Sequence, residues 1–209
     1  MATMKQGILG GLSGKIGNVV GSSWKGIPVL KSLPLSVANP NTAGQQAQRG
    51  AFTKVVEAAQ ALLAGLITAY WNKWAEKMSG FNSFISKNIK AFDATGLVAA
   101  GNIVVGTSVS HPAHTLGISC NAATDDIDFT FIDNTGEEGA LATDTAVLVA
   151  YNETTDQWYF DAVGTRRNSS PGNMPGVVQT IGDTVYGFLA FENADGVLGG
   201  TDDDQAVSA

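Results

Sequence analysis

The most regular pattern of apolar positions in the chain runs through residues 52–78. Apolar residues recur there at steps of three and four, which is the spacing of one face of a helix. Asn39-Pro40 before this run indicates a turn, and Thr42 followed by Gln45 has the spacing of a capping box. The sequence therefore predicts a helix that begins near Ala43.

A second, shorter run with the same spacing covers residues 81–92. Gly65 weakens the middle of the first helix, and Ser79-Gly80 is expected to end it. The two runs together predict a helical hairpin.

The character of the chain changes after Gly96 to short apolar runs separated by turn residues every 8 to 12 positions or so, a pattern typical of a β-sandwich. In residues 184–192 both alternating faces are largely apolar, so we expect a central strand there. The predicted strands are residues 103–110, 115–121, 127–132, 146–152, 158–164, 177–180 and 184–192.

Residues 7–26 hold seven glycines mixed with large apolar side chains, whereas a flexible linker would lack the latter. A phosphate-binding loop is excluded because Leu9 and Ile16 flank Gly14-Lys15 where that motif needs Gly and Ser or Thr. No two glycines are separated by a single residue, so the dinucleotide-binding fingerprint fails too.

Residues 15–25 alternate as a strand would, and one side of that strand carries few side chains. Lys25-Gly26 then predicts a turn into a second extended run, residues 27–33, which Pro34 ends. Two strands alone are marginal in water, so we expect this hairpin to pack against something else.

Glycine inside a strand allows another backbone to approach closely, which Gly17 and Gly21 would permit here. The segment is therefore interpreted as a docking arm anchored by Trp24. An irregular wrap around the protein's own helix fits the same spacing, and spacing does not choose between the two. The residues predicted to form an assembly interface are Lys15, Gly17, Gly21, Trp24, Lys25, Trp71 and Trp74.

Trp71 and Trp74 enter that set because both lie on the apolar stripe of the first helix, which indicates core or interface packing. The whole pattern predicts an α+β fold with three parts. These are a glycine-rich β-ribbon arm (residues 1–38), a helical hairpin (39–95) and an antiparallel, Ig-like β-sandwich (96–209).

The formal net charge of −7 conceals an uneven distribution along the chain. Residues 1–92 hold ten Lys or Arg and two Glu, a net of +8, whereas residues 93–209 hold two Arg and seventeen acids, a net of −15. This asymmetry predicts a basic part that binds an acidic partner and an acidic part that stays solvated. Nucleic acid is not the expected partner, because the basic residues are mostly single lysines without interleaved arginine and aromatic residues.

Three further features of the sequence limit the chemistry and the cellular location that we expect. The single cysteine, Cys120, cannot form an internal disulfide, and its strand-like surroundings favour an inert thiol. No run approaches the roughly 18 apolar residues of a membrane span, and the first residues lack the apolar core of a secretory signal. We therefore expect synthesis in the cytoplasm of a host cell and no contact with a membrane.

No motif indicates catalysis, a cofactor or a metal. His111 and His114 are interpreted as two exposed histidines of a turn, because a metal would need further ligands at matched spacing. The acidic runs 125–128 and 202–204 lack the ligand spacing of a calcium loop and are interpreted as a solvated face or tail.

The first 90 residues or so resemble a widespread family of virion proteins found in phage genomes and in bacteria. The shared pattern is SGKxGxVV followed by NPxTxxQxxxR, which this chain matches at residues 13–20 and 39–49; Lys31 stands where the family often has arginine. The resemblance implies a virion setting and an Ig-like C-terminal part, and it implies no catalytic residue.

Three functional hypotheses follow. The first is a non-enzymatic structural subunit of a phage particle (capsid-decorating, head-fibre or tail-associated), which docks to sister subunits or other particle proteins through its basic N-terminal part. The second is a homo-oligomer that grows head to tail into a filament or tube. The third is a ligand- or carbohydrate-binding module, for which Tyr151, Trp158 and Tyr159 would supply the aromatic surface.

Overall fold

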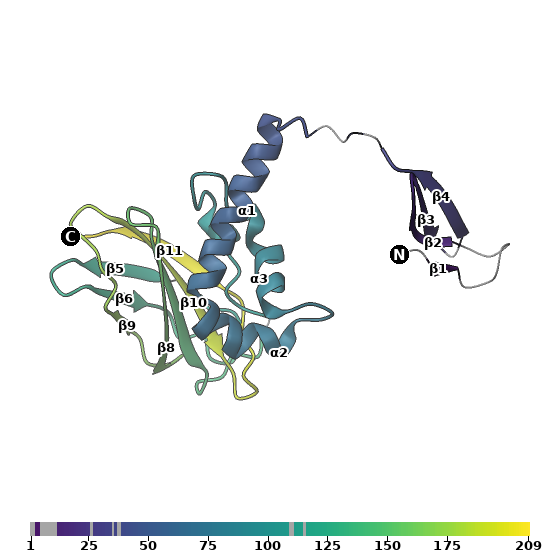
Figure 1. Cartoon of the computed structure of the whole chain (residues 1–209). Helices are drawn as coiled ribbons and strands as arrows, with labels where there is room; N and C mark the ends of the chain where they lie inside the picture. The colour runs from purple at the N-terminus through teal and green to yellow at the C-terminus, as the bar shows by residue number, and fades with distance from the viewer. Residues whose placement is uncertain are drawn as a thin grey trace. The chain divides into compact units, whose positions relative to one another are not determined.

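Figure 1 shows the computed structural model of the chain, which describes residues 3–4, 12–25, 27–34, 36, 39–108, 111–114 and 116–209. The chain divides into two compact units, Met1–Thr42 and Ala43–Ala209. The first is called the N-terminal unit and the second the body.

The N-terminal unit is an antiparallel sheet in the order β1-β2-β3-β4. Its strands are β1 (Thr3–Met4), β2 (Leu12–Ile16), β3 (Val19–Trp24) and β4 (Ile27–Ser32). The predicted turn at Lys25-Gly26 is confirmed by the pairing of Trp24 with Ile27, although Gly26 itself lies outside the described residues.

The prediction of one strand over residues 15–25 is wrong. Ile16 pairs with Val19, so Gly17 and Asn18 form a two-residue hairpin turn in the middle of that run. Gly17 has φ +54°, a left-handed conformation that suits glycine in such a turn. The alternation across residues 15–25 therefore does not describe the two faces of a single strand.

The body contains two antiparallel sheets and a set of helices (Figure 1). The four-stranded sheet has the order β11-β10-β7-β8, and the three-stranded sheet has the order β5-β6-β9. Their bounds are β5 (Gly117–Asn121), β6 (Asp126–Thr130), β7 (Thr145–Asn152), β8 (Gln157–Arg166), β9 (Gly172–Pro175), β10 (Thr184–Glu192) and β11 (Asp202–Val207).

The four-stranded sheet is buried on both faces. Alternate residues of β7 divide between two cores: Val147 and Val149 pack with the helices, while Ala146 and Leu148 pack with the three-stranded sheet. β10 lies between β11 and β7, which confirms its predicted central position. The body thus has three layers: helices, a four-stranded sheet and a three-stranded sheet (Figure 1).

The helical layer begins at Ala43, as predicted, but the first helix is not continuous to Met78. The helical elements are α1 (Ala43–Ala61), a π-helix η1 (Leu63–Trp71), α2 (Asn72–Trp74), α3 (Gly80–Asn88), and the 3₁₀ turns η2 (Ile89–Ala91) and η3 (Ala100–Asn102). Between Ala43–Ala61 and Leu63–Trp74 the axis bends by 86°.

Two local features accompany this bend. The Ile67 N–H donates to the Leu62 carbonyl (3.1 Å), five residues back, which is the hydrogen bond of a π-helix. A Cβ atom on Gly65 would lie 2.3 Å from Cδ1 of Phe160, so the glycine lets η1 approach β8 closely. Ser79, expected to end the helix, is instead the N-cap of α3, where its hydroxyl accepts the Asn82 N–H (3.3 Å).

Two predicted strands are wrong. Residues 103–108 of the predicted strand 103–110 have no strand structure, and residues 109–110 lie outside the described residues. The Val105 and Gly106 N–H groups donate to Thr201 Oγ1 (2.8 and 2.9 Å) instead of to a neighbouring strand. Residues 177–180 form no strand either, since Val177 and Gln179 donate to the carbonyl and carboxylate of Asp125. The strand in this region is β9, earlier in the chain.

The interpretation of residues 202–204 as a tail is also wrong, because they begin β11. Asp202 Oδ2 accepts the Leu116 N–H (2.9 Å) and Asp204 Oδ2 accepts the Ile118 N–H (3.0 Å). The two carboxylates thus take the place of a strand partner for this part of the chain and link the two sheets.

The predicted domain boundaries also change. Helices and sheets belong to one unit, because helical residues such as Leu66 and Phe84 share a core with Val149 and Phe188 of the four-stranded sheet. A boundary at 95/96 would cut through this core. The remaining boundary falls at Thr42, close to the predicted end of the arm at residue 38.

Among the described residues, no single helix combines the length and the apolar composition needed to cross a membrane. The helices Ala43–Ala61 and Leu63–Trp74 reach the required length and apolar composition only when they are counted together, and the axis bends between them.

The central carboxylate of β11 provides a test of this strand. Partial burial and repulsion from Asp202 and Asp204 raise the pKa of Asp203, so its charged form opposes folding at neutral pH. This opposition weakens as the pH falls through the raised pKa. Asp203→Asn is therefore expected to raise Tm at pH 7 by about 2 °C or more. Most of that advantage should be lost near pH 3.5, because residue 203 is then mostly protonated in the native chain and also in the unfolded chain, where an aspartate has a pKa of about 3.9.

Asp195→Asn removes the same charge from an exposed turn and is the matched control in thermal melts at the two pH values. If Asp203→Asn lowers Tm at pH 7, the described environment of β11 is incorrect.

Candidate docking site and polar clusters of the body

One face of the N-terminal sheet is apolar and uncharged. Residues directly opposite each other in an antiparallel pair share a face. Val19 pairs with Ile16, and Gly21 pairs with both Gly14 and Leu30, so these five residues from three strands lie on one face. We call them the docking face.

The apolar side chains of the docking face are solvent-exposed. The exposed fractions are 53% for Ile16, 40% for Val19 and 66% for Leu30, while Gly21 is buried between its neighbouring strands. Gly21 is also the only buried residue of the N-terminal unit among those whose burial is described. The unit therefore presents apolar side chains without enclosing them in a core of its own, which is a feature of interaction sites.

The opposite face carries lysine. Lys15 pairs with Val20, and Val20 pairs with Lys31, which places the two lysines on either side of one β3 residue. Residues 1–42 contain four lysines and no acid. The docking face thus belongs to a unit whose sequence, residues 1–42, has a net charge of +4.

The predicted interface residues of this unit have different environments in the structure. Lys15 and Lys25 are exposed, and Gly21 lies in the middle of the docking face. Gly17 is in a turn, where an added Cβ would meet nothing within 4 Å in this chain, so the predicted approach of a partner backbone at this glycine stays a prediction. Trp24 ends β3, and its side chain lies outside the described residues.

The two predicted helical tryptophans have different environments. Trp71 is 3% exposed, packs edge-on against Phe84 (5.2 Å between centroids) and donates its Nε1–H to the Val105 carbonyl (3.0 Å). Trp74 is 48% exposed. Both line a small cavity of about 190 Å³ together with Ser83 and Lys87. Trp71 is thus a core residue, and only Trp74 offers a free surface in this chain.

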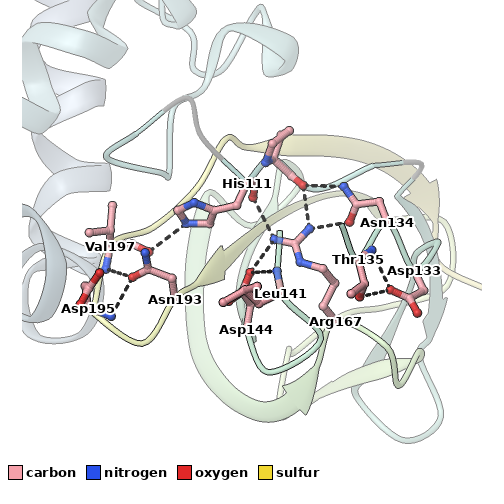
Figure 2. Close-up of polar contacts among 11 residues, drawn as sticks. His111, Asp133, Asn134, Thr135, Leu141, Asp144, Arg167, Asn193, Asp195 and Val197 are labelled. Carbon is pink, nitrogen blue, oxygen red and sulfur yellow. Dashed lines mark hydrogen bonds and ion pairs between the residues drawn. The ribbon is translucent and has the colours of Figure 1, made fainter. Parts of the chain in front are cut away.

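A buried polar cluster of the body surrounds Arg167, whose side chain is fully buried; Figure 2 shows its contacts. Its Nη1 donates to the Pro112 carbonyl (2.7 Å) and to Asn134 Oδ1 (2.6 Å), and its Nη2 donates to the His111 carbonyl (2.9 Å). The guanidinium also lies 3.9 Å from the centre of the Phe191 ring. The arginine therefore ties residues 111–112 and 134 to the sheet.

The charge of Arg167 is balanced by one buried carboxylate. Nη2 lies 3.4 Å from Oδ2 of Asp144, which is 1% exposed and also accepts the Leu141 N–H (2.9 Å). Burial lowers the pKa of Arg167, and the nearby carboxylate opposes that shift. Because the pair is enclosed and built into loop backbone, it serves to hold the loops in place.

The prediction of two exposed histidines holds for His114 and is wrong for His111. His111 is 4% exposed, and its Nε2 lies 3.2 Å from the Val197 carbonyl (Figure 2). No group of three or more His, Cys, Asp or Glu among the described residues is placed to hold a metal ion. Burial raises the pKa of the Cys120 thiol to about 11, so it is protonated at neutral pH.

The aromatic residues proposed for a carbohydrate surface pack against the two cores of the body, with Tyr151 buried and Trp158 and Tyr159 half-buried. Tyr151 is 2% exposed and stacks on Trp158 (4.5 Å between centroids), which in turn stacks on Phe188 (6.0 Å). Tyr159 packs against the other core, on the opposite side of the sheet.

The predicted single strand over residues 15–25 does not place Ile16, Val19 and Leu30 as neighbours on one face. The signal available was the Gly17-Asn18 pair, a frequent two-residue hairpin turn, which would have split the predicted strand at the right position.

These features define an α+β protein: a helix-covered body with two sandwich-like antiparallel sheets, joined to a small basic sheet with an exposed apolar face. The chain belongs to the family described as "Family of unknown function (DUF6266)", whose model matches residues 11–200. No curated protein matches the chain significantly.

Solved structures with some similarity include the FN1–FN3 domains of chicken CNTN1, at 10% identity and a TM-score of 0.39, covering 48% of this chain and 35% of that one. Another is a family 76 glycoside hydrolase from a bovine Bacteroides thetaiotaomicron strain, at 14% identity and a TM-score of 0.34, covering 46% of this chain and 20% of the enzyme. The matched parts are thus minor portions of both structures, and neither similarity bears on function.

The Arg167 cluster provides a stability test. Arg167→Met leaves the buried Asp144 carboxylate and several oxygen acceptors without their partner, so unfolding in urea is expected to show a loss of about 3–5 kcal/mol. The double variant Arg167→Met with Asp144→Asn removes the unpaired charge as well. It is therefore expected to be more stable than Arg167→Met alone.

Lys90→Met is the control, because it removes an exposed cation from the same body. An unfolding free energy for Arg167→Met within about 1 kcal/mol of the native value would contradict a structural role for the cluster.

Proposed function

We propose that this chain is a non-enzymatic structural subunit of a larger protein assembly and that its N-terminal sheet is the part that docks. The observation that carries the proposal is the docking face. Three exposed apolar side chains lie together on a small, basic sheet that has no described core of its own. Covering them with a partner removes apolar surface from water, which favours association.

The division of charge supports the same proposal. The N-terminal unit carries four lysines, whereas residues 93–209 carry seventeen acids and two arginines. A basic docking unit would be attracted to an acidic partner surface, and the acidic layers would stay hydrated. Opposite charge also speeds association more than it strengthens the final complex.

The polar clusters of the body also favour a structural role. Arg167 and Asp144 hold loops together, and the Lys54–Asp156–Tyr151 set links α1 to the β7–β8 turn. There, Asp156 Oδ2 lies 2.5 Å from Lys54 Nζ, and Tyr151 donates to Oδ1 (2.9 Å). The charged side chains of these two clusters thus form contacts that stabilise the fold.

The narrower form of the proposal is a subunit of a phage particle: a capsid-decorating, head-fibre or tail-associated protein, with an Ig-like sandwich facing outward. It is supported by the resemblance of residues 13–20 and 39–49 to a phage virion pattern. Its partners would be sister subunits or other particle proteins.

The test compares two substitutions on the same strand. Leu30→Asp places a charge on the docking face, whereas Ile27→Asp places it at an equally exposed position whose register puts it on the other face; the exposed fractions are 66% and 58%. We expect Leu30→Asp to reduce the fraction of tagged chain that sediments with purified particles by about tenfold or more, because an interface anchor is lost. Ile27→Asp should sediment nearly as the native chain does.

Circular dichroism should show native melting of the body in both variants, because the N-terminal unit is separate from its cores. Equal incorporation of the two variants would refute the docking role of this face. Absence of the native chain from the particles would refute the particle setting.

A further inference from the structure

The cavity beside Trp71 and Trp74 is enclosed by three separate parts of the body. Trp74 is the last residue of α2, Ser83 and Lys87 lie four residues apart on α3, and residues from the segment 104–108 form the third wall. Residues four apart on a helix share a face, which is why α3 brings both polar side chains to the same cavity. We call it the tryptophan cavity.

Hydrogen bonds fix the third wall of the tryptophan cavity. Asn88, the last residue of α3, donates its Nδ2–H to the Val104 carbonyl (3.1 Å) and accepts the Val104 N–H through Oδ1 (2.7 Å). The N–H groups of Thr107 and Ser108 both donate to the Leu198 carbonyl (3.1 and 2.9 Å). The cavity is therefore preformed, which lowers the entropic cost of filling it.

Two polar side chains of the lining are available to a ligand. In the part of the chain that the structure describes, neither the Ser83 hydroxyl nor the Lys87 ammonium has a hydrogen-bond or ion-pair partner. The other two lining hydroxyls differ: Thr107 Oγ1 lies 3.4 Å from the Leu198 carbonyl, and Ser108 also has a partner. One ammonium and one hydroxyl on the same helix face suit a carboxylate, which only accepts hydrogen bonds.

The charge around the tryptophan cavity also favours an anion. None of its described lining residues is acidic. Residues 72–90, which supply two of its walls, carry four lysines and one glutamate, a net charge of +3. A site lined by one sign of charge attracts ligands of the opposite sign.

The rest of the lining is apolar and sets the kind of group that carries the carboxylate. It consists of Trp71, Trp74, Ala75, Val104 and Gly106. Trp74 is 48% exposed, so its indole has surface left on which a flat ring can stack. A sugar would bring several hydroxyls that each need a partner when buried, and only two free polar side chains line the cavity. The lining therefore favours an aromatic ring over a sugar ring.

The volume limits the size of the ligand. Pockets for drug-sized ligands are roughly 300–1,000 Å³. The tryptophan cavity, at about 190 Å³, has room for a compound with a single ring.

We propose that the tryptophan cavity binds a small aromatic carboxylate. The ring stacks on the Trp74 indole, and the carboxylate accepts hydrogen bonds from Lys87 Nζ and Ser83 Oγ. The site is formed by residues of the body and uses none of the docking face, so the inference stands apart from the proposed function.

The experiment titrates purified full-length protein with four probes and measures binding by calorimetry or ligand-observed NMR. Phenylacetate has both the ring and the carboxylate, and it should bind with a dissociation constant of about 1 mM or below. Phenylacetamide lacks the charge, acetate lacks the ring, and glucuronate carries its carboxylate on a sugar ring. Each of these three should bind about tenfold more weakly or worse, because one of the two contacts is lost.

Substitutions in the lining assign each contact to its side chain. Lys87→Met should reduce the affinity for phenylacetate to that for phenylacetamide and leave phenylacetamide binding unchanged. Trp74→Ala should weaken both probes by about tenfold, and Trp74→Phe, which keeps a flat ring, should restore most of the affinity. Lys90→Met removes an exposed cation outside the lining and should bind as the native chain does.

Both substituted side chains are exposed, so circular dichroism should show native melting of these variants. Four results would overturn the inference. The first is no saturable binding of phenylacetate by the native chain up to about 10 mM. The second is equal binding of phenylacetate and phenylacetamide, and the third is tighter binding of glucuronate than of phenylacetate. The fourth is an affinity for phenylacetate that neither Lys87→Met nor Trp74→Ala changes.

Discussion

The body depends on the burial of one strand pair from both sides. β7 and β10 lie next to each other in the middle of the four-stranded sheet, and their alternate residues enter two separate hydrophobic cores. Because a strand turns successive side chains to opposite faces, such a strand needs apolar residues at nearly every position. The helices and the three-stranded sheet are each placed by the face they must cover.

Covering a sheet on both sides encloses irregular chain, and its backbone groups then need partners. The structure supplies several of them from side chains. Thr201 accepts two N–H groups from residues 105–106, Asp202 accepts that of Leu116, and Arg167 donates to carbonyls of residues 111–112. Together with backbone bonds such as those from Thr107 and Ser108 to the Leu198 carbonyl, these contacts let loops lie beside the cores without joining a sheet.

The sequence predicts the elements that are buried in a periodic pattern, but it does not predict the loops that are held by hydrogen bonds from side chains. Burial follows from periodicity, so the central strand at residues 184–192 and the helix start at Ala43 were predictable. Bonds between side chains and distant backbone leave no periodic trace in the sequence, so the apolar pattern predicts a strand at residues 103–108 and a solvated face or tail at residues 202–204, where the structure has an irregular segment and the start of β11. The 86° bend was equally hidden, because the apolar stripe continues through it while Gly65 meets Phe160 from another part of the chain.

The candidate site was predicted in location but not in geometry. The glycine-rich segment was expected to dock, and its structure is a sheet in which Ile16, Val19 and Leu30 share a face. In the body, apolar strands are covered on both faces by the chain itself, whereas the apolar side chains of the docking face are exposed.

Hydrogen–deuterium exchange of the native protein, compared between the free chain and the chain bound to purified particles, tests this central claim most directly. The account predicts slower exchange on binding in peptides that cover β2, β3 and β4, with no change in the buried strands β7 and β10. Unchanged exchange in the strands of the N-terminal sheet of the bound chain would contradict it.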